Sequence, residues 1–355
     1  MAANAPLTAR DIRAAFDENT DKRARDLAAS LGISEAALVA AQIGHGATAI
    51  AANPDDLMPQ IPALGEVLAL TRTPSVVHEK VGVYDNFQSG KHASMVLTKD
   101  IDLRIFPGHW AFAFAVESEG KTGVRRSIQV FDKAGDAVHK IHLRETSNTD
   151  AYAPMVEALR LDEQLDTLPL EPRVPATPAI ERADRADVLR REWDRMTDTH
   201  QFMLLTRKLK INRLGAYRIA GAPYVRPLAL GSVDQLLTTL GETGVPVMVF
   251  VGNHGCIQIH SGPVKQIKKM GPWMNVMDPG FNLHLRSDHV AEIYEVRKPT
   301  KRGMAISVEA FDADGAIIMQ IFGMRVNGED HVAAFEALLP DLEDLSTTQN
   351  SEEVA

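Results

Sequence analysis

One histidine, His200, lies in the stretch TDTHQFMLL, residues 197–205, at a position that belongs to the apolar stripe of an expected helix. On a helix expected over residues 184–210, large apolar side chains share its face: Trp193, Met196, Met203 and Leu204. Such a histidine is either a buried structural residue held by a hydrogen bond, or a metal ligand beside a large, flat apolar molecule. The helical pattern alone favours the structural interpretation, because most histidines in a chain ligate nothing.

An internal repeat bears on this choice. Residues 102–145 and 282–325 align without a gap at an offset of 180, and eleven of the 44 aligned positions are identical. A fixed long offset indicates a duplicated unit. The two copies differ chemically, because Arg104 aligns with His284 and no histidine aligns with His200. The sequence therefore predicts one site rather than two.

Each copy is expected to place helices before an antiparallel sheet. Amphipathic spacing predicts helices over residues 9–30, 34–43, 184–210 and 212–220. Apolar runs predict strands within 67–83 and 245–261, and the turns AGD and DADG each predict a closing hairpin. The predicted fold class is therefore α+β, present twice in tandem.

The expected domain boundaries follow from composition. Four prolines in LPLEPRVPATPAIERAD indicate a linker at residues 166–184. The first repeat then occupies residues 1–165 and the second occupies 185–344. The polar residues 345–355 are expected to form a disordered tail.

Composition excludes several classes of protein. The 355-residue chain has a net charge of −9, which argues against general nucleic-acid or anionic-membrane binding. It has no apolar run of about 20 residues and no secretory signal at its N-terminus. Its one cysteine, Cys256, excludes intrachain disulfides, thiolate zinc sites and cysteine-ligated iron–sulfur clusters. We therefore expect a cytoplasmic protein.

Four motifs occur in order along the chain: DLRIFPGHW, DTHQF, VRKPT and IFGMR. With them the chain resembles the haemin-degrading factor family, the cytoplasmic haem-binding proteins of bacterial haem-uptake operons, from about residue 10 to residue 340. The resemblance implies that His200 is the proximal ligand of the haem iron and that Arg104 faces the other side of the haem. Phe106, two residues along the expected strand, is expected to wall that side. The haem is then expected in the cleft between the repeats.

The two haem propionates require cations. The resemblance implies that Arg213, Lys298 and Arg325 supply them. Pro299 biases Lys298 to an extended conformation. Each cation, taken alone, is more often a solvated surface side chain than a ligand. Phe322 stands where the family commonly has a tyrosine, so one expected hydroxyl donor is missing.

Other histidine-containing segments are weaker candidates. His109 and His289 are equivalent in the two repeats, which favours a structural role. His139 and His142 lie three residues apart in an expected strand, so their side chains point to opposite faces. The sequence GNHG, residues 252–255, predicts a turn, and we find no nucleotide-binding motif.

Three functions remain open. The protein degrades haem with an external reductant, Arg104 acting on the bound oxidant and the iron being released. Alternatively, it is a carrier that passes haem from an inner-membrane transporter to a haem-degrading enzyme. In the third case it is a duplicated α+β protein that binds something else. The sequence predicts no oligomeric state.

Overall fold

A computed structural model describes residues 7–120, 123–326 and 328–345, and the chain divides into two compact units. Unit 1 contains Met1–Arg72, Glu79–Val174 and Gly252–Gln258. Unit 2 contains Thr73–His78, Pro175–Val251 and Ile259–Ala355. Two strands, β3 (Val76–Gly82) and β12 (Cys256–Gly262), are therefore shared between the units. The predicted tail lies, from residue 346 on, outside the described residues.

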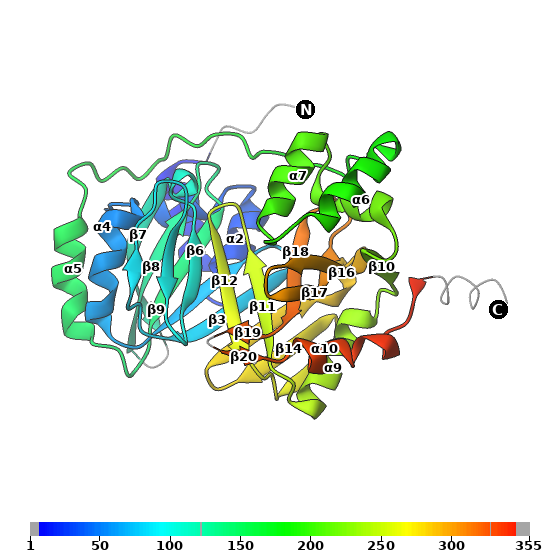
Figure 1. The fold of residues 1–355 in the computed structure, drawn as a ribbon. Helices are drawn as coiled ribbons and strands as arrows, with labels where there is room; N and C mark the ends of the chain where they lie inside the picture. Colours follow the sequence, from blue (N-terminus) through cyan, green and yellow to red (C-terminus); the bar gives the residue numbers. More distant parts are fainter. Residues whose placement is uncertain (1–6, 121–122, 327, 346–355) are drawn as a thin grey trace. The chain divides into compact units, whose positions relative to one another are not determined.

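Unit 1 begins with three short helices, α1 (Ala9–Glu18), α2 (Ala24–Leu31) and α3 (Glu35–Ala40). Five antiparallel strands follow in the spatial order β1 (Ala47–Ile50), β7 (Phe112–Gly120), β8 (Gly123–Phe131), β9 (Ala137–Leu143) and β2 (Val67–Arg72). Three further strands are adjacent in the order β6 (Asp102–Ile105), β5 (Ser94–Leu97) and β4 (Phe87–Gln88). Helix α3 packs on β1 and β7, and helices α4 (Pro54–Leu57) and α5 (Tyr152–Leu159) complete the unit (Figure 1).

Unit 2 repeats this arrangement. Its first helices are α6 (Ala186–Asp194), α7 (Gln201–Leu209) and α8 (Arg213–Ala220). Its five-stranded order is β10 (Val225–Leu228), β16 (Glu292–Thr300), β17 (Gly303–Phe311), β18 (Ile317–Gly323) and β11 (Val247–Gly252). The second group is β15 (Phe281–Arg286), β14 (Trp273–Asp278) and β13 (Ile267–Met270). The other α-helices and strands that lie wholly within unit 2 are α9 (Ser232–Thr243), β19 (Arg325–Val326), β20 (Glu329–Asp330) and α10 (Val332–Glu336).

The predicted tandem α+β duplication is confirmed. Strands β8 and β17 begin and end 180 residues apart, as do β7 and β16, and β9 and β18. Both closing hairpins turn at a glycine, Gly135 and Gly315, each with φ of +83°, a conformation that glycine adopts without steric cost. Each hairpin also shifts register at the matching residue, Phe131 or Phe311. The duplication thus extends to local irregularities of the sheet.

Two predicted helices are wrong in extent. Residues 9–30 form α1 and α2 rather than one helix, and residues 184–210 form α6 and α7. Helix α6 ends with Arg195 as its C-cap, and in the segment before α7 Asp198 accepts the backbone N–H of His200 at 2.8 Å. A short polar side chain that bonds nearby backbone competes with a continuous helix. His200 is consequently the N-cap of α7 and does not lie in the middle of a helix.

The apolar core of unit 2 fixes the helices beside His200. Trp193 of α6 is fully buried, and its indole N–H donates to the backbone oxygen of Arg297 on β16 at 2.8 Å. Its ring contacts Phe202 of α7 and Tyr217 of α8, with centroids 4.7 and 6.2 Å apart. Burying an aromatic side chain of this size contributes about 2–3 kcal/mol. This aromatic cluster therefore holds α6, α7 and α8 in a fixed arrangement.

Within the described ranges, no helix has the length and apolar character that a bilayer-spanning segment requires.

Candidate functional site

His200 is exposed and oriented. Its side chain is 94% exposed, and its Nδ1 lies 2.6 Å from Oδ1 of Asp198. The same oxygen accepts the backbone N–H of His200, so a single carboxylate fixes both the backbone and the ring. These two hydrogen bonds lower the pKa of Asp198.

This contact selects a ring tautomer. An ionised carboxylate only accepts, so Nδ1 must carry the proton in the contact with Asp198. In the neutral ring the lone pair then resides on Nε2, the nitrogen farther from the backbone. A histidine that donates one N–H to a carboxylate and presents its other nitrogen is the usual arrangement of a metal ligand. The interpretation of His200 as a buried structural residue is wrong, because the side chain is solvent-exposed.

Helix α7 exposes apolar side chains to solvent three and four residues after His200. Met203 and Leu204 are 56% and 66% exposed, whereas Trp193 and Met196 of the predicted stripe are buried. The stripe is therefore divided between the core and the surface. A hollow of about 290 Å³ lies beside Met203 and Leu204, lined further by Thr206, Arg207, Ile211, Asn212 and Arg213. Exposed apolar side chains grouped beside a candidate ligand indicate a binding surface.

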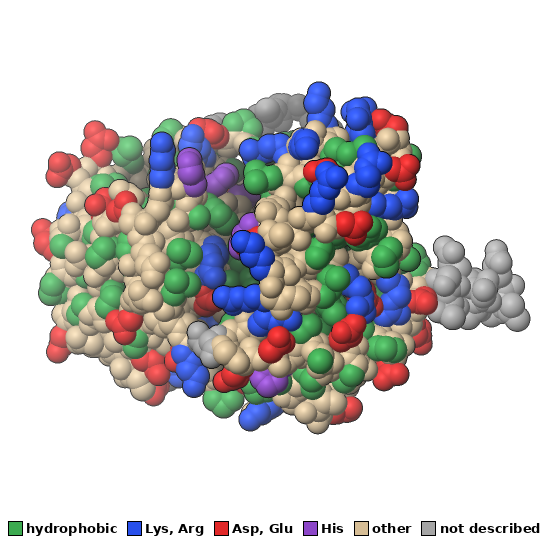
Figure 2. All heavy atoms as spheres, viewed as in Figure 1, with side chains coloured by type: hydrophobic (Ala, Val, Ile, Leu, Met, Phe, Trp, Pro, Cys, Tyr) green, Lys and Arg blue, Asp and Glu red, His purple; other side chains and the backbone are tan. Residues whose placement is uncertain are grey.

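Basic side chains lie beside this apolar surface, because Arg207 and Arg213 line the same hollow. Figure 2 shows Lys and Arg side chains together with hydrophobic and acidic ones over α6 and α7. Arg207, seven residues after His200, lies on the same face of α7 and is exposed. The sequence prediction missed Arg207 and Asp198, although helical spacing and the D-x-H pattern were visible signals.

Arg213 is anchored by a buried acid. Its Nη1 donates to Glu309 of β17 at 3.0 Å and to the Tyr217 hydroxyl at 3.2 Å. Its Nη2 lies 3.6 Å from Sδ of Met203. The guanidinium therefore connects the buried acid to the exposed apolar surface of α7.

Lys298 belongs to the same buried network. Its Nζ donates to the Tyr217 hydroxyl at 2.7 Å and to Glu309 at 2.9 Å, and the side chain is almost completely buried. Burial lowers the pKa of Lys298 to about 8, although Glu309 opposes this shift. Burial would raise the pKa of Glu309, but Lys298 and Arg213 outweigh it and lower that pKa to about 2. Lys298 is extended on β16, as predicted.

Arg325 is also paired. Its Nε donates to Asp330 at 2.8 Å across the short β19–β20 ladder, and its side chain is 21% exposed. Phe322, where a tyrosine was expected, packs against Phe250 with ring centroids 5.2 Å apart.

In unit 1, Arg104 lies on β6 and forms an ion pair with Asp102 two residues earlier, on the same face of the strand. Burial raises the pKa of Asp102, and Arg104 opposes this. Phe106 follows the end of β6 in an extended conformation and is half-buried, as Asp102 and Arg104 are. The expectation that Arg104 and Phe106 share a face agrees with this alternation.

His139 shows why not every histidine is a candidate. It is buried in unit 1, with Nε2 2.6 Å from the Tyr84 hydroxyl and Nδ1 2.8 Å from the Thr71 hydroxyl. Burial lowers the pKa of His139 to about 3. Both ring nitrogens are occupied, so this histidine presents no free lone pair.

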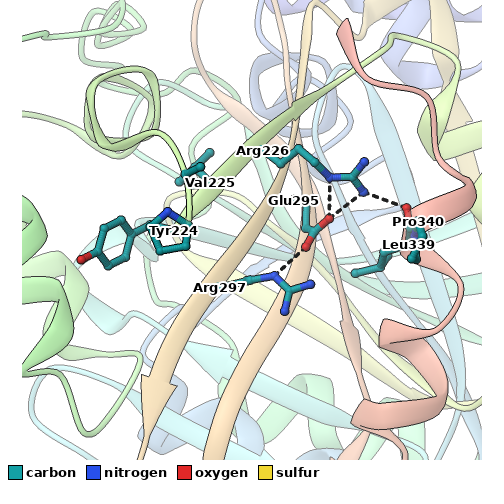
Figure 3. Close-up of a pocket in the computed structure, with 9 residues that line it drawn as sticks. Tyr224, Val225, Arg226, Glu295, Arg297, Leu339 and Pro340 are labelled. Atoms are coloured by element: carbon teal, nitrogen blue, oxygen red, sulfur yellow. Dashed lines mark hydrogen bonds and ion pairs between the residues drawn. The ribbon is translucent and has the colours of Figure 1, made fainter.

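A larger pocket of about 480 Å³ lies elsewhere in unit 2 (Figure 3). Arg226 and Arg297 line it and both donate to Glu295. Arg226 also donates to Asp344 and to the backbone oxygens of Leu339 and Leu342, and Arg297 also donates to Glu336. The charges are mutually compensated, and none of the predicted site residues lines this pocket.

A metal held by protein side chains alone has no place in the described part of the chain, where no three His, Cys, Asp or Glu side chains converge. A haem iron differs, because the porphyrin supplies its equatorial ligands and the protein adds one axial ligand. His200, the apolar surface of α7 and the nearby guanidinium groups fit such a molecule.

Comparison with known proteins identifies the family. The family model of the haemin-degrading HemS.ChuX domain matches the chain twice, over residues 32–159 and 210–342. The hemin transport protein HemS of Yersinia enterocolitica is 37% identical over 313 residues, which are 88% of this chain and 90% of HemS. The chain belongs to this family of haemin-degrading proteins, as the four motifs predicted.

Two solved structures share the fold. The haem-bound form of PhuS, a heme-binding protein from Pseudomonas aeruginosa, matches with a TM-score of 0.90 and 41% identity, covering 95% of this chain and 98% of PhuS. The structure of ChuS, an E. coli heme oxygenase, matches with a TM-score of 0.84 and 32% identity, covering 94% of this chain and 99% of ChuS.

Proposed function

We propose that this protein binds haem through Nε2 of His200 and degrades it with electrons from an external reductant, releasing the iron for use by the cell. The observation that carries the proposal is the exposed imidazole of His200, which is oriented by Asp198 and lies beside an exposed apolar surface. An axial ligand needs a free lone pair, and the haem plane needs apolar contacts. His200, the N-cap of α7, meets the first requirement, and Met203 and Leu204 in the first turns of α7 meet the second.

The propionates need cations at the edge of this surface. Arg213 supplies a partly exposed guanidinium, and Arg325 is a second candidate. Because Lys298 is already bonded to Glu309 and Tyr217, we propose that it supports propionate binding by holding Arg213 in place. Because Phe322 has no hydroxyl group, the contact that the tyrosine of the family would make is missing in this protein.

Arg104 is proposed as the distal residue, and Phe106 as its apolar neighbour. A guanidinium is a permanent donor that stabilises negative charge as it develops on an oxidant. Catalysis requires this stabilisation, whereas haem transport does not.

A carrier function is the second candidate, and the exposure of His200 favours it. A ligand that is 94% exposed is accessible to a competing ligand on an acceptor protein. A carrier of this kind receives haem from an inner-membrane transporter and passes it to a haem-degrading enzyme. Of the relatives, HemS is named a transport protein and ChuS a heme oxygenase, so both functions have a precedent.

One optical experiment separates the two. Purified protein is mixed with one equivalent of haemin, and ascorbate is added in air with catalase present while the Soret band is followed. Degradation predicts a shifted Soret band that decays while an open-chain tetrapyrrole band appears. A shifted band that persists selects the carrier, and an unshifted band rejects haem binding altogether.

A further inference from the structure

We propose that Asp198 is a positioning residue that makes His200 a strongly donating axial ligand and thereby favours ferric haem. The inference rests on the proposed function, because it concerns the same ligand. It adds a property that ligation alone does not imply: the midpoint potential of the bound haem is lower than it would be without the carboxylate of Asp198.

The geometry of Asp198 supports this role. Its Oδ1 lies 2.6 Å from Nδ1 of His200, a short contact of the kind that a charged acceptor makes. The carboxylate makes no other hydrogen bond among the described residues apart from the backbone N–H of His200. Its hydrogen bonds are thus devoted to a single residue.

The position of the pair at the N-terminal end of α7 adds a second argument. His200 is the N-cap of the helix, yet its side chain makes no capping hydrogen bond. The side chain of Gln201 reaches back instead and accepts the backbone N–H of Thr197 at 2.8 Å. The backbone N–H groups at the start of α7 therefore make no hydrogen bond with the imidazole of His200, and its Nε2 remains available to a ligand.

The chemical consequence concerns electron density. A carboxylate that accepts the Nδ1 proton increases the negative character of the imidazole, so Nε2 becomes a better donor. A better donor stabilises the more positive iron, which is the ferric form. The reduction potential of the bound haem falls, as second-shell hydrogen bonds alter the potentials of haem centres in general. Haemin, which is ferric, is then retained more firmly than reduced haem.

The first test needs no haem. Nitrogen-15 NMR of the haem-free protein at neutral pH identifies which nitrogen of His200 is protonated. We expect the Nδ1–H tautomer in the natural protein and a shift toward the Nε2–H tautomer in Asp198→Ala. A natural protein that holds His200 mainly as the Nε2–H tautomer would overturn the proposal, whether or not haem binds.

The second test measures the haem complex. We compare Asp198→Asn, which keeps an acceptor oxygen but loses the charge, with Asp198→Ala and with the natural protein. Loss of an outer-shell partner typically weakens metal affinity about 10–100-fold. We therefore expect ferric haem affinity to fall by about tenfold or more in Asp198→Ala, and the midpoint potential to rise in both variants. The iron–histidine stretching band should move to lower frequency in both.

Asp187→Asn is the matched control. Asp187 is an exposed carboxylate of α6 whose charged contact is to Arg190 in the same helix, so this variant removes one charge without touching His200. Its midpoint potential should equal that of the natural protein. Equal potentials in Asp198→Asn and the natural protein, with the iron–histidine band present in both, would refute the role of Asp198 and leave haem ligation intact. A missing iron–histidine band in the natural protein would instead refute the proposed function.

Discussion

The chemistry proposed for His200 depends on the hydrogen-bond partners of its two ring nitrogens and not on its being a histidine. His139 and His200 are both histidines, but the ring of His139 is enclosed by two hydroxyl partners, whereas that of His200 keeps one nitrogen open. Neither motif spacing nor helical pattern distinguishes these environments, because both depend on side chains from other elements. The D-x-H pattern indicates only the local contact, in which the carboxylate of Asp198 reaches Nδ1 of His200.

Arg104 provides a prediction at this scale. We expect Arg104→Ala to retain haem affinity within about threefold, because the arginine binds no propionate, and to lose haem turnover at least tenfold. Haemin titration and the ascorbate time course measure the two quantities. Arg126→Ala, which removes another arginine ion pair of unit 1, is the control. Unchanged turnover in Arg104→Ala would remove Arg104 from the mechanism.

At the scale of elements, the sequence predicted the sheets better than the helices. Strands and hairpins were recognisable from alternation and turn residues, and the repeat gave each of them a second, independent copy. The prediction of one helix over residues 184–210 was wrong. The apolar residues keep helical spacing through the whole range, so the spacing did not reveal the break between α6 and α7. Local hydrogen bonds of Asp198 and Gln201 lie at this break, and their strength against a continuous helix cannot be judged from spacing.

The exposed side of α7 gives a second prediction. Met203→Ser with Leu204→Ser should change the free energy of unfolding by less than about 1 kcal/mol, because both side chains are exposed already. Haem affinity should fall about tenfold or more, since each side chain loses apolar contact with the ligand. Denaturant unfolding and haemin titration measure these effects, with Leu230→Ser, another exposed leucine of unit 2, as the control. Unaltered haem affinity would place the haem elsewhere.

The buried carboxylate of Glu309 gives a third prediction. Glu309→Gln leaves Lys298 buried without its carboxylate, so we expect a loss of about 3–5 kcal/mol in the free energy of unfolding. Glu292→Gln, which removes a partly exposed partner of Arg218, should cost about 1 kcal/mol or less. Denaturant titration at neutral pH compares the two. Equal costs would show that the buried network contributes no more than a surface pair.

The same acid predicts a pH dependence. The pKa of Glu309 falls from 4.5 to about 2 on folding, so the folded state binds fewer protons between these values. Its contribution to stability is complete above pH 4.5 and is lost as the pH falls toward 2. The natural protein should therefore lose stability more steeply than Glu309→Gln across this window. Parallel curves in acid denaturation would contradict the assignment.

For the whole molecule, the duplication is regular in its backbone and unequal in its chemistry. The hydrogen-bonded residues Thr71, Tyr84 and His139 of unit 1 have apolar counterparts at the offset of 180. These counterparts are buried core residues of unit 2: Val251, Val264 and Met319. A polar cluster in one copy and an exposed histidine in the other show that each copy has diverged separately. The sequence predicted this inequality from the alignment of Arg104 with His284 and from the absence of a histidine aligned with His200.

This inequality predicts the stoichiometry. Because no histidine aligns with His200 in unit 1, one haem should bind per chain, and the Soret titration should end at one equivalent. A titration that ends at two equivalents with the same spectrum would indicate a second site that the repeat analysis missed.

The most direct test of the central claim is a haemin titration of His200→Ala beside the natural protein. His331→Ala, which changes a partly exposed histidine of the same unit, is the control. We predict that the natural protein and His331→Ala give the same shifted Soret band, and that His200→Ala binds haem at least tenfold more weakly with a different spectrum. A His200→Ala variant with the affinity and spectrum of the natural protein would contradict the account.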